Sequence, residues 1–172
     1  MAHFSELCSP GDGTDWVDER EERRDVKNGR MEELLHVGRQ VLESQPFSVL
    51  VGARVASISE GEAVLEVPVR EELFQQYGSV HGGVVSYLAD NALTFAGGTV
   101  LGLRVLTQEY KIDYLRTARG RTLVARASVV HAGRRRAVCR CDVFAAGADG
   151  DETLCATAQG TIVSVASPAQ AR

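Results

Sequence analysis

The stretch from His81 to Gly98 carries the residues with the clearest chemical potential in this chain. A His-Gly-Gly triplet opens it, two glycines close it, and the interior is apolar on nearly every side. Between His81 and Leu103, Asp90 is the single formally charged side chain. An acid in apolar surroundings is costly unless it is paired, hydrogen-bonded or protonated. Asp90 is therefore the leading candidate for a catalytic residue.

The apolar pattern predicts one buried helix, shorter than a helix that would span a membrane. The first N–H groups of a helix have no partner within it, and the helix macrodipole is positive there. Glycine at positions 82 and 83 lets a ligand approach the backbone closely, because no Cβ is in the way. The start of the helix, beside His81, is therefore suited to hold a developing oxyanion.

Helix geometry separates these two chemical groups. Gly83 and Asp90 are seven positions apart, an axial rise of about 10.5 Å. An oxyanion donor and a nucleophile should both lie about 3 Å from the reacting carbonyl. If both groups serve one carbonyl, they must come from two subunits whose helices face each other antiparallel, and a two-fold axis would create two equivalent sites. The spacing therefore predicts a homodimer.

Structural roles are the alternative for these residues. The triplet at 81–83 could have a purely structural role, as a tight turn from the loop into the helix. Asp90 could be a buried acid that hydrogen-bonds to Ser86 or Thr94.

The flanking segments must position this helix. The first 14 residues show little periodicity and are expected to be disordered, and Trp16 to Ser44 is expected to be helical, with a possible break at Asn28-Gly29. Pro46 should end that helix. After Pro46 we expect six strands, at 47–58, 62–69, 104–116, 121–130, 135–144 and 153–165, with glycine-containing turns between them. A single turn of helix is expected at 71–74.

Successive hairpins of this kind form an antiparallel sheet. One helix and one sheet must cover each other's apolar faces, so the predicted fold class is α+β, with the sheet wrapped around the central helix. The 172 residues suit one domain. A net charge of −4 and a pI near 5.6 give no reason to expect nucleic-acid binding.

The four cysteines lack the spacing of a metal or redox site, and no secretory signal is visible. Reduced thiols and a cytoplasmic location are therefore expected.

The residues His81-Gly82-Gly83 and Leu88-Ala89-Asp90, with 47–52 upstream and 111–116 downstream, resemble the hotdog-fold acyl-CoA thioesterases of the PaaI type. The resemblance divides the chain into an N-terminal extension (1–45), a hotdog domain (46–166) and a flexible tail (167–172). It implies a homodimer, often a homotetramer, that hydrolyses acyl- or aryl-CoA thioesters. It implies neither a metal nor a redox cofactor, since coenzyme A belongs to the substrate, and no membrane partner.

The resemblance also assigns roles by position. Asp90 matches the catalytic carboxylate, which activates water or attacks the thioester carbon. Gly83 matches the residue whose backbone N–H polarises the carbonyl, and His81 the histidine beside it. Gln75 stands where the family commonly has Asn. Thr107 falls where some members carry a Ser or Thr that helps to hold the attacking water.

Three further residues are candidates for substrate binding. Gly82 would allow close approach of the substrate, and Tyr87 could line an aryl or an aliphatic pocket. Arg134, in an arginine-rich turn, could meet the phosphates of CoA, although a solvated hairpin is the alternative there. Gln75 as a surface loop residue and Thr107 as an ordinary strand residue also stay open.

Two other functions remain as alternatives to the thioesterase. A hotdog dehydratase would need a histidine and an acid poised at the α- and β-carbons, whereas the triplet puts His81 beside the oxyanion donors. A non-catalytic acyl-CoA-binding module would gain nothing from a buried acid such as Asp90. The sequence therefore favours thioester hydrolysis.

Overall fold

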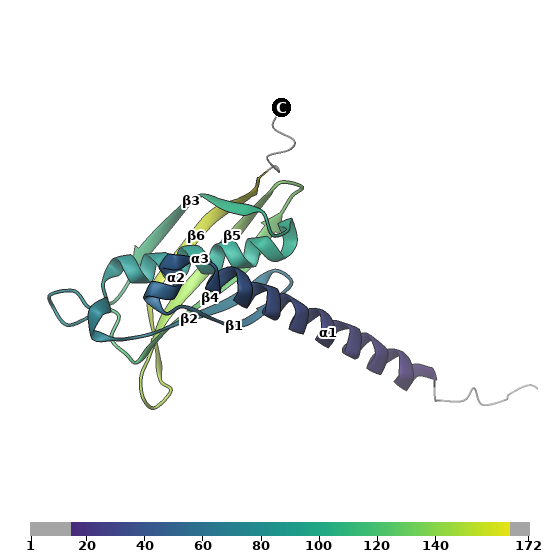
Figure 1. The fold of residues 1–172 in the computed structure, drawn as a ribbon, viewed down its shortest axis with the longest axis horizontal. Coiled ribbons are helices and arrows are strands. Elements are labelled where there is room, and N and C mark those ends of the chain that lie inside the picture. The colour runs from purple at the N-terminus through teal and green to yellow at the C-terminus, as the bar shows by residue number, and fades with distance from the viewer. Residues whose placement is uncertain (1–14, 166–172) are drawn as a thin grey trace, which may run out of the picture.

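The computed structural model describes residues 15–165 and shows one helix held by a curved sheet (Figure 1). The predicted disorder of residues 1–14 and the predicted flexible tail lie outside the described residues. The elements follow the order α1 (Asp15–Glu43), α2 (Pro46–Val51), β1 (Arg54–Ser59), β2 (Glu62–Pro68), the 3-10 turn η1 (Glu71–Leu73), α3 (Gly82–Leu101), β3 (Val105–Tyr114), β4 (Thr122–Ala132), β5 (Arg136–Ala146) and β6 (Glu152–Ser164).

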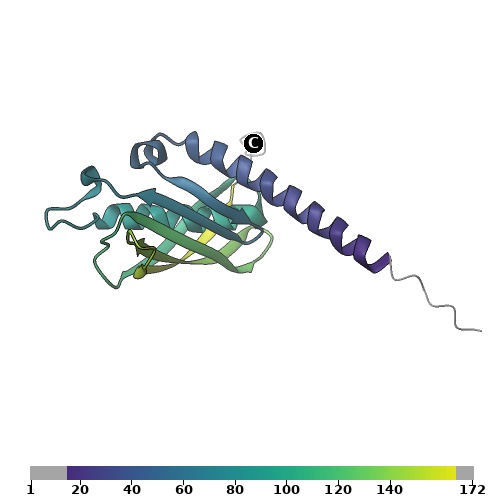
Figure 2. The same cartoon turned by 90° about the horizontal axis from the view of Figure 1, so that it is seen from below.

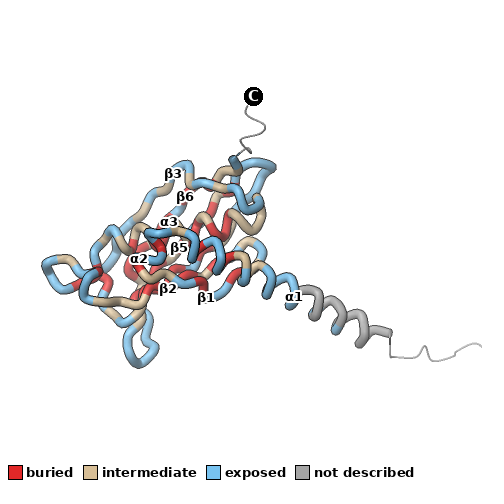
Figure 3. The backbone as a smooth tube through the Cα atoms, viewed as in Figure 1, coloured by how far each residue is buried: buried red, intermediate tan, exposed pale blue. Residues whose placement is uncertain are grey.

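The sheet is six-stranded and antiparallel, in the order β1-β2-β4-β5-β6-β3. It curves around α3, which packs against every strand (Figure 2). Buried residues gather where α3 meets the central strands, whereas the described side chains of α1 are largely exposed (Figure 3). The predicted α+β class, with a sheet around a central helix, is confirmed.

The central helix is less enclosed than its composition suggests. Its sheet-facing side is fully buried, as at Leu88, Ala92 and Leu93. On the side towards the edge strand β3, Asp90 and Thr94 are partly exposed in the single chain. Gly97 allows α3 to approach the sheet closely, since a Cβ on residue 97 would lie only 2.8 Å from the Cβ of Ile162 in β6. One face of α3 is thus core and the other remains accessible.

The prediction of a strand over 47–58 is wrong for its first half. Pro46 stands at the start of a short helix, where its missing N–H is not needed. Gly52 ends that helix with φ at +79°, and its N–H reaches the carbonyls of Ser48 and Val49. Ser48 and Val51 are buried three residues apart on one side of the helix. Packing therefore overrides the strand preference of the Phe-Ser-Val-Leu-Val run.

The predicted run of hairpins is wrong at one step. β3 does not pair with β4 but lies at the far edge of the sheet, against β6. The connection between β3 and β4 crosses the end of the sheet, where Leu115 N–H bonds to the Cys155 carbonyl and Arg121 N–H to the Ala146 carbonyl. Neighbouring strands usually pair, and here the crossing breaks that rule.

The N-terminal helix is continuous from Asp15 to Glu43, so Asn28-Gly29 does not break it. It runs beside β1 and extends past the end of the sheet (Figure 2). Within residues 15–165, the helices are all too short or too polar to cross a membrane.

Candidate active site

Asp90 lies in a compact cluster of hydroxyl groups between α3 and β3. The Thr107 hydroxyl lies 2.6 Å from Oδ1 of Asp90 and donates to it. The Thr94 hydroxyl lies 2.8 Å from that of Thr107 and 3.0 Å from the main-chain carbonyl of Asp90. The predicted pair of Asp90 and Thr107 is therefore brought together, and Thr94 joins it.

The hydrogens in this cluster can be assigned. Thr107 has a single hydroxyl hydrogen, which it donates to Asp90. In its contact with Thr94 it must therefore accept, and the Thr94 hydroxyl shares its own single hydrogen between Thr107 and the main-chain carbonyl of Asp90. Oδ2 of Asp90 receives no hydrogen bond from residues 15–165. One carboxylate oxygen is thus fixed, and the other is available to a substrate or a water molecule.

A bulge in β3 explains why Thr107 faces the helix together with residues further along the strand. Thr107 pairs with Ile162 and Glu109 with Thr161, so Gln108 is an extra residue. The inward positions are therefore 105 and 107 before the bulge, and 110 and 112 after it.

Two tyrosines of β3 extend the contact towards the start of α3. The Tyr110 hydroxyl lies 2.6 Å from that of Ser86, and the Tyr114 hydroxyl donates to the carbonyl of Gly82 across 3.0 Å. Sequence reasoning missed this role of both tyrosines. A usable signal existed, because residues 82, 86, 90 and 94 repeat every four positions and so share one helix face.

The His-Gly-Gly triplet forms the N-terminus of α3, but the backbone N–H of Gly83 already has a hydrogen-bond acceptor. His81 is the N-cap, and the Gly83 N–H donates to His81 Nδ1 across 2.9 Å. The N–H thus has no main-chain partner within the helix, as expected, and is instead capped by the His81 side chain. In this bond Nδ1 is the acceptor, so Nε2 is the ring nitrogen left to donate. A Cβ on residue 83 would lie 2.9 Å from Nδ1, so this cap geometry requires glycine.

Gln75 supports the loop that leads into this turn. Its Nε2 donates to the hydroxyl of Ser79, 2.8 Å away, and Ser79 is buried. Its main-chain N–H also reaches the Ser79 carbonyl. Its side chain thus bonds to the loop rather than to the triplet, in line with the alternative of a loop residue.

The other predicted binding residues lie apart from the Asp90 cluster. The Tyr87 hydroxyl donates to Ser48 across 2.7 Å, and its ring meets Phe47 edge-on at 5.0 Å between ring centroids. Burial raises the pKa of Tyr87, against a smaller opposing effect of Ser48. Arg134 is exposed in the turn between β4 and β5.

Gly83 and Asp90 lie on one continuous helix, seven residues apart. The axial rise between them is about 10.5 Å, so the triplet and the carboxylate of one chain cannot both contact one carbonyl. The geometry of the single chain thus retains the separation that predicted a two-subunit site.

A long helix wrapped by an antiparallel sheet, with an acid on its open face, is the architecture of the hotdog fold. The family model described as the thioesterase superfamily matches residues 77–156, which include the triplet, Asp90 and Thr107. The acyl-coenzyme A thioesterase PaaI of Escherichia coli is 33% identical over 97 residues, 56% of this chain and 69% of that protein.

Two further matches agree. The 1,4-dihydroxy-2-naphthoyl-CoA hydrolase of Listeria monocytogenes is 28% identical over 91 residues, 49% of this chain and 70% of that one. The crystal structure of a thioesterase family protein from Silicibacter pomeroyi superposes with a TM-score of 0.71 at 32% identity, covering 76% of this chain and 96% of that one. The chain belongs to the thioesterase superfamily, so the predicted hotdog fold and the class of thioester hydrolase are confirmed.

Proposed function

We propose that the protein is an acyl-CoA thioesterase that hydrolyses a CoA thioester to a free acid and CoA. The observation that carries this proposal is the Asp90 carboxylate, partly exposed on α3 and fixed through one oxygen by Thr107. The relatives named above act, by their names, on CoA thioesters, which supports the same substrate class.

Oδ2 of Asp90 is the reacting atom in this proposal. As a general base it takes a proton from water while the water oxygen attacks the thioester carbon; the C–S bond then breaks and the departing thiolate takes a proton. As a nucleophile it attacks the carbon itself, CoA leaves, and water hydrolyses the resulting anhydride. The Thr107 hydroxyl orients the carboxylate for either route.

The carbonyl oxygen of the substrate takes the place of His81 Nδ1 as the acceptor of the Gly83 N–H. His81 turns aside when this happens, and the N-terminus of α3 then stabilises the developing negative charge. Because of the helix spacing, the donor that serves Asp90 is Gly83 of the partner subunit. The active unit is thus at least a homodimer, with the hotdog domain at 46–166 and the first 45 residues as an extension.

The test is thiol release from acetyl-, hexanoyl-, dodecanoyl- and phenylacetyl-CoA, with Asp90→Asn compared with the wild type. Asn is nearly isosteric but can neither accept a proton nor attack. We expect a loss of about 100-fold or more. Asp113→Asn is the matched control, because that exposed carboxylate pairs with Lys111 on β3. Wild-type protein that binds these esters without releasing thiol would instead be an acyl-CoA-binding module.

A further inference from the structure

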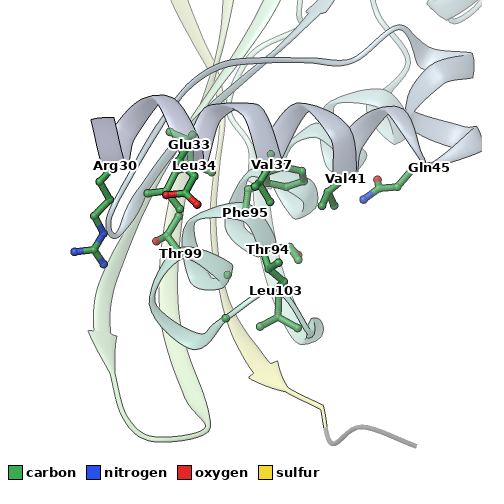
Figure 4. Close-up of a pocket in the computed structure, with 15 residues that line it drawn as sticks. Arg30, Glu33, Leu34, Val37, Val41, Gln45, Thr94, Phe95, Thr99 and Leu103 are labelled. Carbon is green, nitrogen blue, oxygen red and sulfur yellow. The ribbon is translucent and has the colours of Figure 1, made fainter. Parts of the chain in front are cut away.

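A cavity of about 430 Å³ lies between α1 and the C-terminal half of α3 (Figure 4). One wall is α1, which lies outside the residues matched by the family model. The other wall is the end of α3 with the start of β3, which lies within them. Its size is within the usual range of small-molecule sites.

The cavity is mainly aliphatic and elongated. Leu34, Val37 and Val41 of α1 point towards α3 at helical spacing, and Phe95 and Leu103 face them (Figure 4). The α1 residues that line it run from position 30 to position 41, about 16.5 Å along the helix. A long aliphatic slot matches a flexible hydrocarbon chain better than a short planar ring.

The polar groups at the two ends already have partners. Arg30 pairs with Glu60 at 3.3 Å, and Gln45 accepts a hydrogen bond from Ser48 at 2.6 Å. Glu33 is exposed at the rim. The middle of the cavity therefore offers apolar contact rather than a site for a charged group.

The cavity also reaches the Asp90 cluster. Thr94 lines it, and the Thr94 hydroxyl contacts Thr107, which in turn donates to Asp90. A thioester whose carbon lies at Asp90 can therefore extend its acyl group past Thr94 into the cavity.

Gly38 indicates that space is needed here. It is buried in the interior of α1, where glycine is less favourable than alanine by about 1 kcal/mol. A Cβ on it would make ordinary contacts, 3.5 Å from Ile58 Cδ1 and 3.6 Å from Phe95 Cε1. An alanine would therefore fit, whereas a larger side chain would fill the cavity.

We propose that this cavity binds the acyl chain of the substrate, that the chain is a medium to long unbranched aliphatic one, and that α1 sets the length it accepts. This inference rests on the proposed thioesterase function.

The test compares Gly38→Leu with Gln40→Leu, which places the same side chain on an exposed position of α1 that does not line the cavity. In the wild type we expect kcat/KM to be highest for dodecanoyl-CoA. Gly38→Leu should lower that value by about tenfold or more, the effect of leaving about two methylenes unburied, and leave acetyl-CoA within about twofold. Gln40→Leu should match the wild type. A wild-type preference for acetyl- or phenylacetyl-CoA, or an equal loss on all esters, would overturn the proposal.

A binding measurement separates this inference from the thioesterase proposal. S-dodecyl-CoA and S-ethyl-CoA are thioethers, which cannot be hydrolysed. We expect the dodecyl compound to bind more tightly by calorimetry, and Gly38→Leu to remove the difference. Chain-length-dependent binding without ester hydrolysis would support the acyl-chain cavity and reject the thioesterase proposal. Ester hydrolysis without chain-length-dependent binding would support the thioesterase proposal and reject the acyl-chain cavity. Gly38→Val, which also extends beyond Cβ into the cavity, provides a smaller variant with the same expected direction should the leucine variant not fold.

Discussion

The Thr107 hydroxyl donates to Oδ1 of Asp90 across 2.6 Å, although 17 residues separate the two in the sequence. The contact joins the edge strand β3 to the central helix. A hydrogen bond to a charged group contributes about 1.5–3 kcal/mol, enough to hold the carboxylate in one orientation. We therefore treat Thr107 as a positioning residue for Asp90.

Replacing Thr107 by valine keeps its shape and removes the hydroxyl. We expect kcat to fall about 10- to 100-fold, in proportion to the lost hydrogen bond, with a smaller change in KM. Thr107→Ser keeps the hydroxyl and should retain most activity, as steady-state thiol release will show. Equal losses in the two variants would mean that the methyl group, not the hydroxyl, is what matters.

Gly83→Pro and Gly83→Ala test the main-chain donor. Both add a Cβ close to His81, but only proline removes the N–H, and the first turn of a helix tolerates proline. We expect Gly83→Pro to lose about 100-fold or more in kcat beyond the loss in Gly83→Ala. Circular dichroism should show that both remain folded. Variants with the same activity would exclude the Gly83 N–H from catalysis.

Mixing two inactive variants tests whether a site needs two subunits. Asp90→Asn and Gly83→Pro, refolded together, should form hybrid dimers with one intact site and recover about a quarter of the wild-type activity. Asp90→Asn mixed with Thr107→Val is the control, because those residues serve the same site from one chain and each site of the hybrid keeps a defect. No recovery in the first mixture would argue that each chain works alone.

Two buried cysteines predict how stability responds to alkaline pH. Burial raises the pKa of Cys139 to about 11, and burial together with the nearby Asp142 charge raises that of Cys141 to about 12. Unfolded thiols titrate near 8.5, so the unfolded chain loses these protons first. The free energy of unfolding should therefore fall as pH rises from about 8.5 towards 11.

Urea unfolding at pH 8 and pH 10 measures this effect. A variant with alanine at both positions should lose less stability over that interval, by about 2 kcal/mol or more. A parallel loss in the two proteins would assign the alkaline sensitivity to other groups.

The sequence alone indicated the central helix, the triplet at its start and the acid within it, because apolar pattern and glycine spacing are local signals. It also indicated Thr107, through resemblance. The pairing of β3 with β6 was missed, since a strand that crosses to a distant edge leaves no local trace. The helix at 46–51 was missed because burial of Ser48 and Val51 outweighed strand propensity. The bond from the Gly83 N–H to His81 depends on a rotamer, which residue types do not specify.

The bulge at Gln108 lets β3 carry one extra residue without changing which of the flanking side chains face α3. Removing this one residue would restore regular alternation, with Thr107, Tyr110, Ile112 and Tyr114 all still facing α3. The Ser86 and Gly82 contacts would then be kept, whereas a residue inserted between Tyr110 and Tyr114 would turn Tyr114 to the opposite face of the sheet. Strand β3 should therefore accept the loss of Gln108 yet reject a single-residue insertion or deletion between Tyr110 and Tyr114.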